Sequence, residues 1–442
     1  MRAKRSNLHL NNRLLRYEPR NDSTVFFVGS LHSLFIGIII LAFNFSCFSQ
    51  ASIFNLPVYP FVRYDLDRIV FSADSCSYDS LFAKMNMLVT KGEGQINIVH
   101  IGDSHIQADY FSGRMRERLQ TFFLGGKGSR GLVFPFKLIH SNNAFNFAVN
   151  STGTWTGCRN IERNKTCTLG LTGASATTTD SISSFSIRLR KQDYPSYDFN
   201  RVKVFHNMDS TSFDIETDNY ILKQEFIDND SLGYTLFVMK TFSDSLTFYI
   251  SKTDTNQKSF TLYGVNLENE DPGIIYHSIG VNGAEVESFL RCSLFTYQLA
   301  KLKPDWVIVS LGTNDCYSAK CNMSAFESNL VTLITMIRSA QPNVPILFTT
   351  PSDNYRKRRY HNPDCAVASD VILKVAKENN CASWNLYEIM GGYCSMADWL
   401  KSGLAARDKL HFDKPGYYLQ GDLLFTAFIK AYDNYIEKMN PF

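Results

Sequence analysis

Patterns that mark fibrous, repetitive and zinc-binding proteins are missing from this sequence. There are no heptads, no collagen triplets and no repeats with a period of about 20–50 residues, which argues against fibres and solenoids. There is no paired C-x-x-C and no H-E-x-x-H, so neither a structural nor a catalytic zinc site is supported. The glycine-rich segment Gly125–Gly131 follows no predicted strand and lacks G-x-x-x-x-G-K-S/T. We therefore interpret it as a flexible loop near the cleft, not as a phosphate-binding loop.

The chain also has little net charge. Its 442 residues include 45 Lys and Arg against 42 Asp and Glu, a formal charge of +3. Residues 1–49 hold six basic and two acidic residues, which is +4, so +3 less +4 leaves −1 for the rest. A near-neutral remainder argues against a nucleic-acid binder held by phosphate contacts. Hydrophobic residues make up 44% of the sequence, enough for a buried core, and the length fits two or three domains.

The first 49 residues have the pattern of an export signal. Basic residues extend to Arg20, an apolar run covers Leu34–Phe43, and the small residues Cys47 and Ser49 are spaced like a cleavage site. The uninterrupted core of ten residues is short for a membrane span. A looser window, 25–48, is long enough to span, so an uncleaved anchor with membrane association is the alternative. Either way, we predict an exported protein in the periplasm or at the cell surface.

Ten cysteines are present, and an oxidising compartment would permit disulfides between them. Cys158 with Cys167 and Cys316 with Cys321 are the pairs that local spacing favours. Nine cysteines remain if the segment with Cys47 is removed, and an odd number leaves at least one free thiol. The alternative for most of these cysteines is that they are small buried apolar residues.

Short apolar runs alternate with amphipathic segments near both ends of the chain. The expected strands are 96–101, 274–279, 306–311, 344–350 and 382–387. The expected helices are 80–88, 110–124, 284–301, 325–340, 366–377 and 417–438. Buried strands that alternate with helices indicate a parallel sheet covered by helices on both faces.

The middle of the chain has a different pattern. Apolar and polar residues alternate with period two in several short runs, which are separated by turns rich in Asp, Asn, Ser and Gly. The runs are 185–190, 201–205, 213–217, 234–240, 246–251 and 260–267. They predict an antiparallel β-sandwich inserted into the α/β domain. The predicted parts are 1–49, signal peptide or anchor; 50–139, first part of the α/β domain; 140–270, β-sandwich; and 271–442, second part of the α/β domain.

The first motif with chemical potential is Gly102-Asp103-Ser104-His105, directly after the strand at 96–101. Ligands of open parallel sheets sit at the carboxyl ends of strands. A serine in a tight turn that enters a helix has an exposed hydroxyl near helix N–H groups, which suits a nucleophile. The alternative is that Asp103 or Ser104 is an ordinary helix N-cap. The adjoining His105 is a rival base, but consecutive side chains rarely face one another, so we expect it to pack beside the site.

Two further loops follow strands of the same sheet. Gly312-Thr313-Asn314-Asp315 follows the strand at 306–311, and the Asn314 amide is a candidate donor to an oxyanion. The alternative is a common turn. Ser278–Ala284 joins a strand to a helix, and the N–H of Gly283, next to the helix start, is a second candidate donor.

The last motif is Asp408-Lys-Leu-His411, just ahead of the final helix. A carboxylate and an imidazole three residues apart in one turn can meet, which leaves the other ring nitrogen for a serine. A solvated loop histidine is the alternative for an isolated motif of this kind.

The ordered set of motifs resembles the SGNH hydrolases, also called GDSL esterases. Gly102-Asp103-Ser104 matches the first family block, although His105 stands where Leu is usual. Gly283 matches the second block, Gly312-x-Asn314-Asp315 the third and Asp408-x-x-His411 the fifth. The resemblance implies a flavodoxin-like three-layer α/β/α fold and esterase chemistry that needs no metal or organic cofactor.

The resemblance also implies roles for individual residues. Ser104 would be the nucleophile, His411 the base and Asp408 the acid that orients the histidine. The N–H groups of Ser104 and Gly283 and the Asn314 side chain would form the oxyanion hole.

An SGNH domain that is interrupted by a β domain between its first and second blocks resembles bacterial peptidoglycan O-acetylesterases. The insert of those enzymes looks like a carbohydrate-binding module. This implies removal of acetyl groups from an exported glycan, with peptidoglycan favoured, by a protein that we expect to be a monomer. Candidate sugar-stacking aromatic residues in the insert are Trp155, Tyr194, Tyr197 and Tyr220, and the favoured alternative for each one is a position in the core or at the edge of the sandwich. The basic run Arg356–Arg359 is a solvated loop that could contact an anionic polymer. The alternatives are an esterase or lipase for acylated plant polysaccharide or lipid, and a non-catalytic glycan-binding envelope protein.

Overall fold

The computed structural model of this chain describes residues 56–72, 76–191, 195–218, 221–229, 232–318 and 321–439. The predicted signal or anchor at 1–49 lies outside these ranges, as do Tyr194 and Tyr220. Each helix within these ranges is too short or too polar to span a bilayer.

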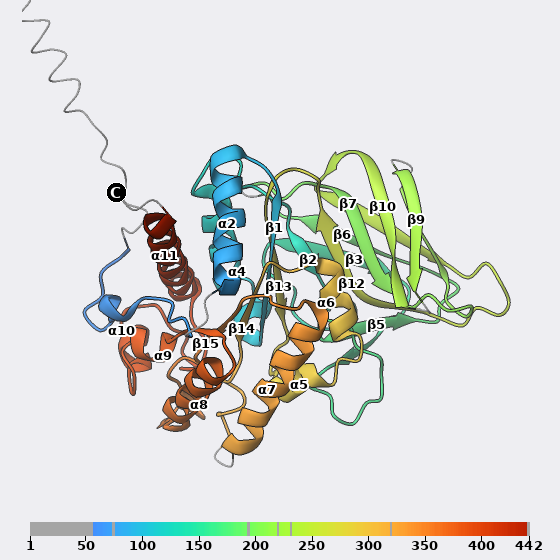
Figure 1. The fold of residues 1–442 in the computed structure, drawn as a ribbon. Helices are drawn as coiled ribbons and strands as arrows, with labels where there is room; N and C mark the ends of the chain where they lie inside the picture. Colours follow the sequence, from blue (N-terminus) through green and yellow to red (C-terminus); the bar gives the residue numbers. More distant parts are fainter. Residues whose placement is uncertain are drawn as a thin grey trace, which may run out of the picture. The chain divides into compact units, whose positions relative to one another are not determined.

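Five parallel strands form the central sheet, in the order β13-β1-β14-β15-β18 (Figure 1). Their bounds are β1 Gln95–Gly102, β13 Gly273–Gly280, β14 Trp306–Ser310, β15 Ile346–Thr349 and β18 Ala382–Trp384. These runs are buried on both faces, as the strands of a helix-covered parallel sheet must be. Numbered along the chain, the order is 2-1-3-4-5, which is the flavodoxin-like order.

Helices cover both faces of this sheet (Figure 1). On one face lie α2 (Cys76–Lys91), α4 (Phe111–Thr121) and α11 (Lys414–Met439), which share an apolar core with β1 and β14. Phe428 of α11 stacks on Trp306 of β14 at 4.9 Å between ring centroids. On the other face lie α5 (Val286–Leu290), α6 (Phe295–Leu302), α7 (Met323–Ala340) and α8 (Asp364–Glu378). The predicted three-layer fold is therefore confirmed.

Two predicted elements differ from the structure. The helix expected at 284–301 is divided into α5 and α6, because the chain between them turns and the Leu294 N–H donates to the Leu169 carbonyl of the β region. The strand expected at 382–387 ends at Trp384. Asn385 then caps the short helix α9 (Leu386–Ile389), accepting a hydrogen bond from the Glu388 N–H.

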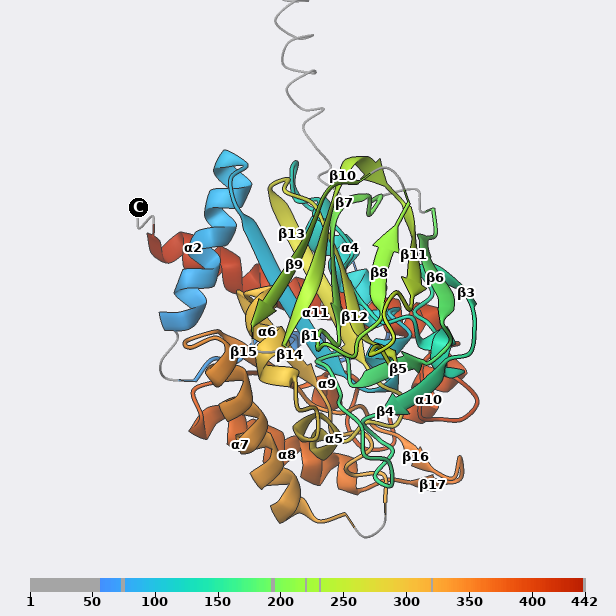
Figure 2. The ribbon, with the colours of Figure 1, turned by 90° about the vertical axis from the view of Figure 1, so that its right-hand side faces the viewer.

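Two antiparallel sheets form the inserted β region, and Figure 2 shows them as separate layers. The larger has the order β4-β5-β12-β7-β10-β9, with β2 also paired to β12, and the smaller has the order β3-β6-β11-β8. The bounds of the larger are β2 Gly131–Val133, β4 Thr156–Arg159, β5 Ala174–Thr178, β7 Phe199–His206, β9 Ile221–Asn229, β10 Leu232–Ser243 and β12 Phe260–Glu268. Those of the smaller are β3 Phe147–Thr152, β6 Ile182–Leu189, β8 Asp214–Thr217 and β11 Ser245–Ser251.

Buried aromatic side chains join the two β sheets. Phe237 of β10 packs against Phe248 of β11, with ring centroids 5.8 Å apart, and Phe248 stacks on Phe185 of β6. Trp155 contacts Phe185 and Phe260 edge-on, and both it and Tyr197 are buried. Face-to-face burial of this kind is the packing of a β-sandwich. It makes Trp155 and Tyr197 core residues, which confirms the favoured alternative for these two and contradicts their candidate role as exposed sugar-stacking platforms.

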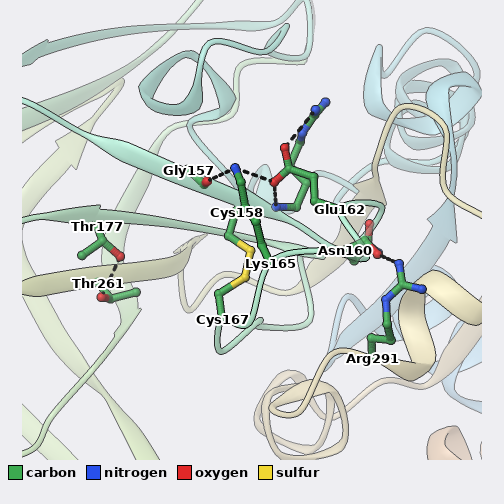
Figure 3. The surroundings of a disulfide bond; sticks show 10 residues. Gly157, Cys158, Asn160, Glu162, Lys165, Cys167, Thr177, Thr261 and Arg291 are labelled. Carbon is green, nitrogen blue, oxygen red and sulfur yellow. Dashed lines mark hydrogen bonds and ion pairs between the residues drawn. A yellow bond between two sulfur atoms is a disulfide. The ribbon is translucent and has the colours of Figure 1, made fainter.

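One predicted disulfide is confirmed and the other is wrong. Cys158 and Cys167 are bonded across a nine-residue separation at the edge of the β region (Figure 3). Cys316 and Cys321 are both free. The Cys316 sulfur lies 3.8 Å from that of Cys365, whereas Cys321 faces Asp364, because α8 brings its N-terminal turn beside the loop after β14.

A buried carboxylate joins the β region to the α/β domain. Asp109 has a left-handed backbone conformation, with φ of 60°, between the short helix α3 (Ser104–Gln107) and α4. It accepts two hydrogen bonds from Arg116, at 2.8 and 3.0 Å, and is paired with Arg130 at 2.8 Å. Asn146, ahead of β3, and Ser278, in β13, also donate to it. The carboxylate thus holds segments from the α4 turn, the β region and the central sheet together.

Replacing this carboxylate should destabilise the whole fold. We expect Asp109→Ala to lower the free energy of unfolding by about 3–5 kcal/mol, because it leaves two buried guanidinium groups without their counter-ion. Urea unfolding followed by tryptophan fluorescence measures the change. Glu327→Ala, which removes a surface partner of Lys374, is the matched control and should unfold as the wild type does. Equal stability of wild type and Asp109→Ala would contradict this account of the network.

Candidate active site

The predicted site residues come together at the carboxyl edge of the central sheet. Ser104 starts α3 directly after β1, and Asn314 lies in the loop after the neighbouring strand β14. His411 lies in the turn ahead of α11. β1 and β14 flank the point where the strand order reverses, which is where doubly wound sheets bind ligands.

Ser104, His411 and Asp408 form one hydrogen-bonded series. The Ser104 hydroxyl oxygen lies 2.9 Å from Nε2 of His411, and Nδ1 of His411 lies 2.8 Å from Oδ2 of Asp408. The other carboxylate oxygen accepts the backbone N–H groups of Leu410 and His411, both at 2.9 Å. Lys409, with φ of 56°, provides the tight turn that lets residues 408 and 411 meet. The predicted spatial convergence of the three side chains is confirmed.

The surroundings of Asp408 favour its ionised form. Partial burial opposes ionisation, but hydrogen bonds from the backbone and ring of His411 and from the Leu410 N–H outweigh it and lower the pKa of Asp408. A carboxylate fixed in this way holds the proton on Nδ1 of His411. Nε2 is then the nitrogen that can accept a proton from Ser104.

Asp103, and not Ser104, caps α3. Its Oδ1 accepts the His105 N–H at 2.9 Å, while the Ser104 side chain faces His411. The two interpretations of the Gly102–His105 turn therefore apply to different residues. Burial raises the pKa of Asp103 to about 7, although hydrogen bonds from the His105 N–H and Thr313 favour the carboxylate.

His105 packs behind the base, as expected. Its ring centroid lies 5.2 Å from that of His411, and its Nδ1 is 3.0 Å from the Tyr417 hydroxyl. Burial, together with the nearby His411, lowers the pKa of His105 to about 3, so its ring stays neutral. It buttresses the imidazole of His411 and leaves the Ser104 hydroxyl to that ring.

The Asn314 amide lies between the serine turn and the loop after β13. It donates to Asp103 Oδ2 at 3.2 Å and to the Ala284 carbonyl at 3.0 Å. Gly283 has φ of 82°, so it forms the left-handed turn next to Ala284. The oxyanion-hole roles of Asn314 and Gly283 stay predictions.

The close backbone approach in the β13 loop is at Gly280. A Cβ there would lie 2.2 Å from the Gln107 nitrogen, so only glycine lets β13 pack against α3. This packing contact is separate from the predicted role of Gly283, which is donation of its N–H to an oxyanion.

Gln107 is a site residue that sequence reasoning missed. Its side-chain oxygen accepts the Asn282 N–H at 2.6 Å, and its amide donates to the Asn142 carbonyl at 2.7 Å. It therefore connects the serine helix, the loop with Gly283 and the start of the β region. Its one sequence signal is a polar residue three positions after Ser104, and that signal does not identify its distant partners.

Comparison with known proteins gives a family match for part of the chain. Residues 244–419 match the GDSL-like Lipase/Acylhydrolase family. The chain resembles the GDSL-like acylhydrolases. The matched segment includes Gly283, Asn314, Asp408 and His411 but not Ser104, which precedes the inserted β region. No curated protein matches the chain.

One solved structure shares the fold over most of both chains. A peptidoglycan O-acetylesterase superposes with a TM-score of 0.69 at 21% identity, over 83% of this chain and 99% of that one. An acetyl xylan esterase matches with a TM-score of 0.29 at 22% identity, over 35% and 80% of the two chains. A GDSL-like lipase from Bacteroides thetaiotaomicron VPI-5482 matches with a TM-score of 0.27 at 16% identity, over 36% and 76%. The fold is that of an SGNH hydrolase, and the family match supports a carboxylic ester hydrolase.

The raised pKa of Asp103 gives a prediction about pH. Because the folded pKa of about 7 exceeds the ordinary value of 3.8, the unfolded state releases this proton first as pH rises. The contribution of Asp103 to stability is therefore complete below pH 3.8 and is lost as pH rises toward 7. Asn cannot ionise, so we expect the free energy of unfolding of Asp103→Asn, relative to wild type, to increase over this range.

Urea unfolding of both proteins at several pH values measures this difference. A buried carboxyl away from Asp103, such as Asp67, titrates in both proteins and cancels in the comparison. A difference that stays constant with pH would contradict the assignment to Asp103.

Proposed function

We propose that this chain is an exported serine esterase that removes O-acetyl groups from a cell-envelope glycan, with peptidoglycan as the favoured substrate. The hydrogen-bonded series from Ser104 through His411 to Asp408 is the observation that carries the proposal. The basic and apolar sequence of residues 1–49 supports export to the periplasm or cell surface. The similarity to a peptidoglycan O-acetylesterase over most of both chains supports an acetylated glycan as substrate.

The proposed reaction begins with proton transfer from the Ser104 hydroxyl to Nε2 of His411. The serine oxygen bonds to the acetyl carbonyl carbon, and the negative charge moves to the carbonyl oxygen. When this intermediate collapses, the sugar hydroxyl leaves with the proton from His411, and an acetyl-serine remains. Water attacks the acetyl-serine with His411 as base again, which releases acetate and restores the hydroxyl. Asp408 stabilises the imidazolium in both halves.

The oxyanion would accept hydrogen bonds from the N–H groups of Ser104 and Gly283 and from the Asn314 amide. Both hydrogens of that amide have protein acceptors, Asp103 and the Ala284 carbonyl. Donation to an oxyanion therefore requires that one of these bonds is shared or released. A full negative charge on the oxyanion attracts an N–H donor more strongly than a neutral carbonyl does, which favours that exchange in the transition state.

The nucleophile is tested by Ser104→Ala. We expect this variant to lose aryl-acetate hydrolysis and labelling by a serine-directed organophosphate, because no other hydroxyl would transfer its proton to the His411 base. The matched control is Ser328→Ala on the exposed surface of α7, which should retain full activity and labelling at Ser104. Hydrolysis by Ser104→Ala at the wild-type rate would overturn the nucleophile. A wild type without labelling would favour a non-catalytic glycan-binding protein.

The oxyanion donor is tested by Asn314→Ala. Loss of one such donor typically lowers turnover by about 10²–10³, so we expect kcat for aryl acetate to fall by that factor in a protein that remains folded. Urea unfolding checks the fold independently of activity. Near-wild-type turnover would remove Asn314 from this role.

The substrate is tested by acetate release from polymers. We expect the wild type to release acetate from O-acetylated peptidoglycan faster than from acetylated xylan, with no release by Ser104→Ala. The reverse preference would favour an esterase for acylated plant polysaccharide.

A further inference from the structure

A broad open groove lies beside the candidate active site, along the segment that leads into the β region. It is lined by Lys137, by most of residues 140–151, and by Tyr110 and Arg190, and its volume is about 1040 Å³. Pockets for single small ligands are usually about 300–1,000 Å³ and largely apolar. This groove lies at the upper end of that range and is open, and its lining includes the amide side chains of Asn142, Asn143 and Asn150. Its size and polarity fit a segment of a hydrated polymer.

The groove is joined directly to the helix that carries Ser104. Gln107, in the same helix, donates to the Asn142 carbonyl, and the Phe145 N–H donates to the Ala108 carbonyl. These bonds fix the floor of the groove against α3. A polymer in the groove would therefore lie against the segment that follows α3, the helix that begins at Ser104.

A series of aromatic rings also connects the groove to the base. His411 packs on His105, His105 on Tyr417, Tyr417 on Tyr110 and Tyr110 on Phe145, with no centroid distance above 6.2 Å. Tyr110 and Phe145 are stacked at 4.6 Å and both are partly exposed in the groove. Aromatic rings and amide side chains are the groups that contact sugar rings and their hydroxyls.

The groove carries positive charge without a countercharge in its walls. Lys137 and Arg190 are exposed and line it, and no Asp or Glu does so among the described residues. Neither cation forms an ion pair within that part of the chain. Lys414, on the first turn of α11, lies 6.0 Å from the Phe145 ring and adds a third cation at the rim, next to the exposed Asp413.

The turn that holds His411 contacts a second group of cations. The Tyr355 N–H donates to the Lys409 carbonyl, which joins this turn to the hairpin of β16 (Tyr355–Arg356) and β17 (Tyr360–His361). Arg356 is paired with Asp364, but the three other basic residues of the run, 357–359, are exposed. The predicted solvated loop is thus a basic hairpin close to the site.

We propose that this groove, with Lys137 and Arg190 as its charged contacts, binds a carboxylate-bearing glycan and presents its acetyl groups to Ser104. The proposal rests on the proposed esterase function for its link to catalysis and adds the class of substrate, an anionic polysaccharide. Unpaired cations in an open groove raise the local concentration of a polyanion, and the stacked aromatic pair and the amides contact its sugar units.

Direct binding tests the groove independently of catalysis. The probe is O-acetylated polygalacturonate, compared with the same polymer after methyl esterification of its carboxylates, and the protein is the full chain with Ser104→Ala. We expect titration calorimetry to show tighter binding of the carboxylate form, weakened by added salt. Lys137→Gln with Arg190→Gln should weaken this binding about tenfold, as expected for two exposed ionic contacts, and leave binding of the methyl ester unchanged.

The matched control neutralises two exposed cations far from the site. Lys91 and Lys377 lie in the last turns of α2 and α8, at the opposite edge of the sheet, and their replacement by Gln removes the same charge. We expect this control to bind the carboxylate polymer as the parent protein does. Equal weakening in both double variants, or equal affinity for the two polymer forms, would overturn the groove as the binding site for carboxylates.

Catalysis separates this proposal from the proposed function. In the active protein, Lys137→Gln with Arg190→Gln should raise KM for acetate release from the carboxylate polymer and leave kcat and aryl-acetate hydrolysis unchanged. Absence of aryl-acetate hydrolysis by the wild type would overturn the esterase function. The titrations would still decide whether the groove binds the polymer. Unchanged KM in the groove variant would overturn the groove and leave the esterase intact.

Discussion

The arrangement of the site depends on one buried carboxylate, Asp109. Burial of this side chain opposes its ionisation, but Arg116 and Arg130 outweigh that effect and lower its pKa. Asp109 lies five residues after Ser104 and has a left-handed backbone conformation, which strains a residue other than glycine. The hydrogen-bond and ion-pair donors around its carboxylate compensate for that strain. Two of them, Arg130 and Asn146, belong to the segment that enters the β region. The insertion therefore stabilises the turn that positions Ser104, instead of merely interrupting the α/β domain.

The sequence predicts the parts of the fold that follow from short-range pattern. All five parallel strands lie where apolar runs indicate them, because a strand buried on both faces must be apolar throughout. The convergence of Ser104 and His411 is predictable because Ser104 follows a strand and His411 precedes a helix, and these two ends share one edge of a parallel sheet. Short separation favoured the pair Cys158–Cys167, which is bonded, but it does not decide the pairing, because Cys316 and Cys321 are closer in sequence and both are free.

The features that sequence reasoning missed depend on contacts between distant segments. Cys316 lies beside Cys365 and not Cys321, because α8 packs its first turn against the loop after β14. The break between α5 and α6 follows from a hydrogen bond to Leu169 in the β region, which no helical periodicity reveals. Gln107 was missed for the same reason, since both of its partners lie far along the chain.

The two carboxylates nearest the catalytic turn have opposite tendencies. Asp408 is partly exposed, bound by N–H donors, and has a lowered pKa, whereas Asp103 is fully buried and has a pKa raised to about 7. An imidazolium at His411 needs a partner that is already ionised, and Asp408 provides it without a further proton transfer. Asp103 changes charge near neutral pH while bonded to the Asn314 amide. Its protonation would weaken its hold on that amide. The burial that reduces stability above acidic pH therefore also affects whether the amide has an N–H free for the oxyanion role proposed for Asn314.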